Sequence, residues 1–263
     1  KGGRPKKPTT VLSDIGRIHR HIIPLVGTRR VKDLTKADIN KVLKDVIAGR
    51  TNCSFKTGKL RGKTIVRGGM GAASRTVGLL SGILTYAVEA GIIESNPAHG
   101  VRRPKDNVRT RRLSDAEYRT LGSILDAASK NDKYRMTVDI IRQLALTGCR
   151  RSEMVALRWE DVDVESSCLR LADSKEGASV RPIGLSVVEY LEERRSKVSK
   201  TYVFPSGEED NPFGSFPNHW EKIFQNTALA DVTPHVLRHS FASLANDLGF
   251  TETTIAALIG HSR

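Results

Sequence analysis

The sequence predicts a mainly α-helical protein, with an N-terminal helical domain followed by an α+β domain that holds a small antiparallel sheet. Three observations predict this class. Apolar residues recur at helical spacing through most of the first hundred residues. Two short strand-like runs flank a Gly-containing turn in the second part. Charge also divides the chain, since residues 1–110 carry 23 Lys and Arg against 7 acidic residues, whereas residues 111–263 carry 20 against 22.

The first domain is predicted to be a helical bundle over residues 10–101, preceded by a basic arm at residues 1–9 that is too rich in Gly, Pro and Lys to fold alone. One amphipathic helix is expected over residues 10–23, with Leu12, Ile15, Ile18 and Ile22 on one face. A second begins at the N-cap Thr35, and a third covers residues 73–90. Residues 50–71 between them are rich in Gly and Lys and are predicted to be a loop that orders on a partner.

An exposed linker is expected at residues 102–112, where Pro, Asn and several basic residues follow Asn96-Pro97. The second domain, residues 113–263, then opens with Ser114 as an N-cap and Glu117 at the capping-box position. A helix through Val138 to Ala145 is expected to stop at Thr147-Gly148, and a new one to begin near Arg150.

Strands are expected next, at residues 168–171 and 180–183, with Lys175 in the turn between them. Two further helices, at about residues 186–198 and 215–229, lead to the C-terminal stretch.

The C-terminal stretch, residues 233–263, reads as two helices. In the first, Val236, Leu237, Phe241, Leu244, Ala245 and Leu248 form the expected core face, while His235 and Arg238 share the opposite side. The second follows the N-cap Thr251 and ends at Gly260, which turns the chain and leaves His261 just beyond. By itself, an H-x-x-R pattern most often marks a solvated polar face.

The net charge of +14 favours a polyanionic partner, and its concentration in the first part favours a nucleic-acid-gripping module beside a domain with a different task. Candidate contacts to a phosphate backbone are Arg75 in the third helix and three linker residues, Arg102, Arg103 and Lys105. The alternative for each is an ordinary surface charge.

Three cysteines without a C-x-x-C pair favour a reducing, cytoplasmic setting over disulfides or structural zinc. No apolar run approaches the ~20 residues of a membrane span, and no signal peptide is visible, so we expect no membrane association. A zinc site on His235 and His239 is a distant alternative, because Val236 stands where a zinc hydrolase carries Glu.

Four separated motifs then form one ordered pattern: T-G-C-R-R-S-E at 147–153, Lys175 in its turn, H-V-L-R at 235–238 and L-I-G-H-S at 258–262. In this order and spacing they resemble the catalytic domain of the tyrosine recombinase, or phage integrase, family. Residues 83–101 also resemble the family's helical core-binding domain, so the resemblance covers nearly the whole chain except the basic arm.

The resemblance implies a site-specific DNA recombinase that cuts and rejoins DNA through a 3′-phosphotyrosyl intermediate and needs no metal or other cofactor. It assigns Arg150 and Arg238 to the scissile phosphate, Lys175 to protonation of the leaving 5′ oxygen, and His235 to proton transfer or orientation at the nucleophile. His261 would hydrogen-bond the phosphate. The implied partner is double-stranded DNA, on which the full-length protein would form a homotetramer.

The family's tyrosine nucleophile lies beyond the last histidine, and none of the five tyrosines here follows residue 235. Because the chain also begins at Lys1, we expect a fragment with an incomplete catalytic domain that binds DNA without cleaving it. The alternatives left open are a non-catalytic DNA-binding fragment or regulator and a type IB topoisomerase.

Overall fold

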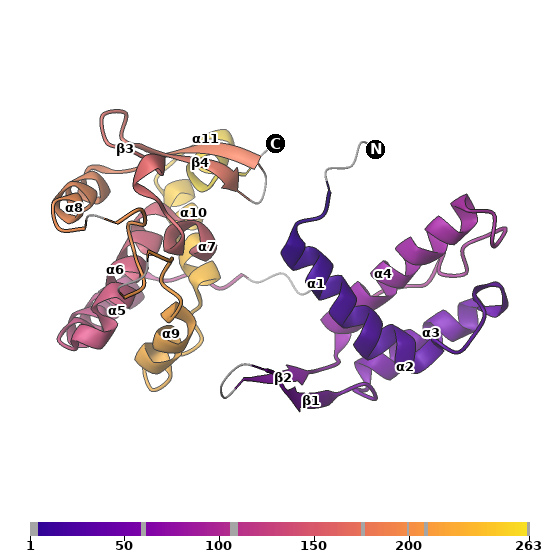
Figure 1. Ribbon diagram of the computed structural model, residues 1–263. Coiled ribbons are helices and arrows are strands. Elements are labelled where there is room, and N and C mark those ends of the chain that lie inside the picture. The colour runs from indigo at the N-terminus through magenta and orange to yellow at the C-terminus, as the bar shows by residue number, and fades with distance from the viewer. Residues whose placement is uncertain are drawn as a thin grey trace. The chain divides into compact units, whose positions relative to one another are not determined.

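The computed structural model describes residues 5–58, 62–105, 110–174, 177–198, 200–207 and 210–261. Within these ranges the predicted class is confirmed, since the chain is mostly helical and carries small antiparallel sheets (Figure 1). It divides into two compact units, Lys1–Arg109 and Thr110–Arg263. No helix in the described ranges combines the length and the apolar character that a membrane crossing requires.

Unit 1 is a helical bundle with one β-hairpin. Its elements are α1 (Pro8–Arg17), a π-helical turn (Ile18–Ile22), α2 (Ile23–Val26), a 3-10 turn (Val31–Asp33), α3 (Lys36–Ile47), β1 (Cys53–Lys56), β2 (Lys63–Val66) and α4 (Met70–Glu89).

The core of unit 1 lies between α3 and α4. Thr35 begins α3 with the predicted cap, accepting a hydrogen bond from the backbone N–H of Asp38 at 3.3 Å. Fully burying a Val, Leu or Ile side chain contributes about 1.5–3 kcal/mol. The two helices bury apolar residues spaced three or four apart, namely Ile39, Val42, Leu43 and Val46 on α3, and Ala73, Val77, Leu80 and Leu84 on α4.

Two expectations for unit 1 differ from the structure. Residues 50–71 do not form a loop only, because β1 and β2 pair as an antiparallel hairpin within this stretch. In the first helix, Ile22 is buried, but Leu12 and Ile15 are exposed. The reason is that the π-helical turn packs on α4 and α2 packs on α3, whereas these two residues lie earlier, on α1.

Unit 2 surrounds one apolar core with helices and a three-stranded antiparallel sheet ordered β3-β4-β5. Its elements are α5 (Asp115–Ser129), α6 (Asp132–Thr147), α7 (Arg151–Val155), a 3-10 turn (Trp159–Asp161), β3 (Val162–Asp163), β4 (Cys168–Ser174), β5 (Gly177–Pro182), α8 (Leu185–Arg195), α9 (Phe216–Phe224), α10 (Pro234–Asp247) and α11 (Glu252–Ile259).

The packing of unit 2 brings segments that are far apart in the sequence to one place. Helix α10 packs on α6 and α11, and α11 packs on β5. The sheet register pairs Leu169 with Arg181, so the two side chains share one face. The end of α6, the middle of α10 and the end of α11 therefore meet around β5.

The expected core face of α10 is wrong in part. Leu244 and Leu248 are exposed, whereas Arg238 is buried beside Leu237. A buried hydrogen bond holds Arg238 inside, since its Nη1 donates to the carbonyl oxygen of Gly148 at 2.8 Å. The helix is thus turned so that an arginine faces inward.

Candidate active site

Arg150 directly follows the turn that ends α6. Gly148 makes this turn with a φ of 60°, a conformation that favours glycine. An added Cβ there would come 2.6 Å from Cδ1 of Phe241, so the turn also lies close against α10. Thr147 fixes the exit from α6 by donating its hydroxyl to the carbonyl of Gln143 at 2.7 Å. The local sequence thereby places Arg150 beside α10.

Glu153 is the carboxylate that organises the site. It accepts hydrogen bonds from the backbone N–H of Arg150 at 2.8 Å and from Nη1 of Arg150 at 2.9 Å. It also accepts one from Nη2 of Arg181 at 2.9 Å. The Glu153 side chain is only 8% exposed, so its charge is nearly desolvated and depends on these two guanidinium groups.

Arg181, on β5, was not among the sequence-based candidates. It is 1% exposed and lies on the inward face of the sheet, where its Nε donates weakly to Oγ of Ser179 at 3.4 Å. Gly260 covers its guanidinium so closely that an added Cβ would overlap Nε and Cζ. Arg181 therefore connects the sheet to the end of α11, next to His261.

Gly260→Ala is expected to destabilise the protein by more than the ~1–2 kcal/mol that a left-handed conformation costs an alanine. The φ of 63° disfavours a side chain, and the new methyl group would also displace Arg181. Urea unfolding checks this, with Gly122→Ala as the control. Gly122 lies within α5 with nothing inside 4 Å of an added Cβ, so this change is expected to be neutral or stabilising. Equal stabilities of the two variants would contradict the expectation.

Arg238 completes a cluster of three guanidinium groups. It is 6% exposed, and burial, together with the positive charges of Arg150 and Arg181, lowers its pKa to about 10. Among the described residues, neither Nη2 of Arg238 nor Nη1 of Arg181 has a hydrogen-bond partner, although both atoms are buried. A buried donor without a partner is costly. The cluster holds three positive charges and one negative charge, Glu153, and thus suits a bound anion.

His235 lies on the helix that carries Arg238, and His261 directly follows Gly260, which covers Arg181. His235, one turn before Arg238 on α10, is exposed and meets the His239 ring edge-on at a centroid distance of 4.7 Å. His261 is also exposed, and its backbone N–H donates to the carbonyl of Ala256 at 2.8 Å, which fixes the chain just after Gly260. Lys175 lies outside the described residues. No group of three or more His, Cys, Asp or Glu is placed to hold a metal ion in the described ranges.

The four candidate DNA contacts all lie in unit 1 and are exposed. Arg75 projects from α4. Arg103 lies against the same helix, because a Cβ added to Gly78 would come 2.5 Å from its Nη1. Positions 75 and 78 are three apart and share one side of α4, so the structure gathers Arg75 and Arg103 there. Arg102 and Lys105 occupy the segment that follows.

Residues 111–263 match the model of the phage integrase family. The chain belongs to the phage integrase family. This integrase chain is 31% identical over 245 residues to the shufflon-specific DNA recombinase of Escherichia coli, covering 90% of the chain and 57% of that protein. It is 28% identical over 203 residues to tyrosine recombinase XerC of Roseiflexus castenholzii, covering 72% and 64%. The predicted family is thereby confirmed, and the chain spans less than two thirds of these relatives.

Solved integrase structures share the fold at low sequence identity. The Tn1549 transposon integrase in complex with circular intermediate DNA superimposes with a TM-score of 0.72 at 17% identity, covering 98% of this chain and 87% of that one. A lambda integrase dimer bound to a COC′ core site also gives a TM-score of 0.72 at 17% identity, covering 99% and 71%. At this identity the comparison supports the fold alone.

Proposed function

We propose that this integrase-family protein is a site-specific recombinase that cuts and rejoins double-stranded DNA. The observation that carries the proposal is the cluster of Arg150, Arg181 and Arg238 around a single carboxylate, with two buried guanidinium nitrogens that have no partner among the described residues. Such a cluster suits a phosphodiester, because guanidinium forks match its non-bridging oxygens and offset the charge that develops on them.

In the proposed reaction, a tyrosine hydroxyl attacks the scissile phosphorus and the bond to the 5′ oxygen breaks. The product is a 3′-phosphotyrosyl link and a free 5′ hydroxyl, and the reverse step rejoins the strand. Arg150 and Arg238 hold the phosphate, and Lys175 gives a proton to the departing oxygen. His235 takes up or orients the tyrosine proton, while His261 donates a hydrogen bond to a phosphate oxygen. In this reaction the protein's own side chains position the phosphate and supply the positive charge, so no metal or other cofactor is needed.

Arg181 has a different role in this proposal. Its guanidinium is covered by Gly260 and tied to Glu153, so it positions Arg150 and the segment that carries His261. It is a positioning residue that also adds positive charge below the phosphate.

The test uses the full-length protein and a nicked DNA duplex that carries its recombination site, which traps the covalent intermediate. The proposal expects a protein–DNA adduct that survives SDS and disappears when the nucleophilic tyrosine is changed to Phe. Binding without any adduct would replace this proposal with the non-catalytic DNA-binding alternative. Relaxation of supercoiled DNA irrespective of sequence would indicate a type IB topoisomerase instead.

A further inference from the structure

The β1–β2 hairpin of unit 1 lies in the most one-sidedly charged stretch of the chain. Residues 46–88 contain seven Lys and Arg and no Asp or Glu. The hairpin follows α3 and leads directly into α4 (Figure 1). A two-stranded hairpin by itself is at best marginally stable in water, so one that persists needs support from the rest of the fold.

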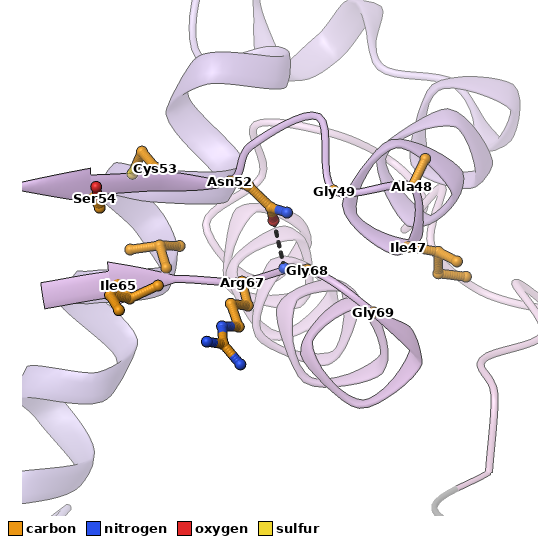
Figure 2. Close-up of a pocket in the computed structure, with 11 residues that line it drawn as sticks. Ile47, Ala48, Gly49, Asn52, Cys53, Ser54, Ile65, Arg67, Gly68 and Gly69 are labelled. Carbon is orange, nitrogen blue, oxygen red and sulfur yellow. Dashed lines mark hydrogen bonds between the residues drawn. The ribbon is translucent and has the colours of Figure 1, made fainter.

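The hairpin is fastened by three contacts, two of them at its root. The guanidinium of Arg20 stacks over the Phe55 ring at 3.8 Å from the centroid. Nδ1 of His21, which is buried, lies 2.6 Å from Oγ1 of Thr51. The side-chain oxygen of Asn52 accepts from the backbone N–H of Gly68 at 2.6 Å, across the two ends of the hairpin (Figure 2). These contacts fix the direction in which the hairpin projects.

One face of the hairpin is directed inward by these contacts and the other is left exposed. The register pairs Lys56 with Lys63 and Ser54 with Ile65, so these four side chains lie on the same face. All four are exposed, Ile65 by 53%. Arg67, the next residue in the alternation after Ile65, is exposed as well.

The exposed face has a charge arrangement that is unfavourable in isolation. Two lysines directly opposite each other on neighbouring strands repel. No acidic residue occurs anywhere in the local sequence to offset them. A polyanion bound on this face would remove the repulsion, and the exposed Ile65 would contact apolar sugar or thymine methyl groups.

From this placement we infer that the outward face of the β1–β2 hairpin, formed by Ser54, Lys56, Lys63, Ile65 and Arg67, is a binding surface for duplex DNA. The three cations contact phosphates on either side of a major groove, whose width admits a two-stranded ribbon. The inference rests on the proposed function, since it names a further contact that a recombinase makes with its DNA. The hairpin of unit 1 would contribute to DNA binding, while the arginine cluster of unit 2 would carry out cleavage.

The first experiment measures the salt dependence of binding to a fluorescein-labelled duplex by anisotropy. The intact chain is compared with the triple variant Lys56→Gln, Lys63→Gln and Arg67→Gln. Each lost phosphate contact lowers the slope of log Kobs against log salt by about 0.9, so the triple variant is expected to lose about 2.7 from the slope. Binding should weaken for all DNA sequences alike.

A matched control removes the same charge from unit 2 through Lys130→Gln, Lys133→Gln and Arg135→Gln. These exposed residues lie just before α6 and in its first turn, about 18 Å or more along the helix from its C-terminal end, next to which the arginine cluster lies. The control slope is expected to stay at the wild-type value. A triple hairpin variant with the slope of this control would overturn the inference.

A second variant keeps the test decisive if the triple variant fails to fold. Ser54→Glu adds a carboxylate to the outward face and removes no contact that the root needs. It is expected to weaken DNA binding, and unchanged affinity would count against the hairpin. The unit 2 control variant should form the covalent adduct at the wild-type rate. Loss of the adduct in every variant and in the intact protein would instead remove the proposed function.

Discussion

Arg238→Ala is expected to lower the rate of covalent adduct formation by about 10²-fold or more, the cost of removing one preorganised charge-stabilising donor. Nη2 of Arg238 is buried and has no hydrogen-bond partner among the described residues, and Nη1 is fixed on the carbonyl of Gly148 at 2.8 Å. The donor is therefore held in place before DNA arrives. A shorter side chain loses both the position and the charge.

The measurement is single-turnover cleavage by the full-length protein at saturating concentration, so that weaker DNA binding does not lower the observed rate. Arg150→Lys is expected to behave similarly, because an ammonium cannot donate to Glu153 as Nη1 does and also present a planar fork to a phosphate. Arg158→Ala is the control, since Arg158 forms an exposed ion pair with Glu160 in the same unit. Cleavage by Arg238→Ala at the rate of this control would exclude Arg238 from the reaction.

Glu153→Gln is expected to lower the free energy of unfolding by about 3–5 kcal/mol, the usual effect of removing one partner from a buried ion pair. Arg150 and Arg181 both pair with this carboxylate at 2.9 Å. Without it, three guanidinium groups would lie close together with no counter-charge among them. Urea unfolding measures the loss.

Two further variants separate charge from packing at Glu153. Glu160→Gln removes an exposed carboxylate from the same unit and should leave stability nearly unchanged. Adding Arg181→Met to Glu153→Gln removes one of the uncompensated charges and should restore part of the lost stability. If the double variant were less stable than Glu153→Gln alone, lost packing would be the main cause.

Much of the fold could be predicted because its signals are local. Thr35 and Ser114 were identified as N-caps from their neighbours alone, and each accepts a hydrogen bond from the backbone N–H three residues on. The breaks at Gly148 and Gly260 were predicted for the same reason, since both glycines adopt positive φ at a helix end.

The hairpin of unit 1 escaped prediction because its support is not local. Its strands are four residues long and mix polar and charged residues, so alternation is weak. The contacts that fasten it come from a distant helix, where Arg20 meets Phe55 and His21 meets Thr51. The spacing of residues within the two strands does not predict these contacts.

Arg181 shows the same limit within the site. Alternation along β5 would place the apolar Val180 inward, yet Val180 is exposed and its charged neighbour is buried. The inward direction of Arg181 follows from the strand register, because Arg181 is paired with Leu169, which is in the core. Only the register, a tertiary property, reveals that this arginine faces inward. The sequence motifs named Arg150 and Arg238 without revealing this third guanidinium beside them.

At the three crowded guanidinium groups, selection for thermal stability and selection for catalytic activity favour different residues. Replacing Arg238 with an apolar side chain of similar volume would remove mutual repulsion and an unsatisfied buried donor, so the DNA-free protein should gain thermal stability. A library of variants screened only for heat resistance would therefore accumulate substitutions at this position. The selected variants would be stable but would not cleave DNA. Engineering a sturdier enzyme would therefore require screening with DNA bound.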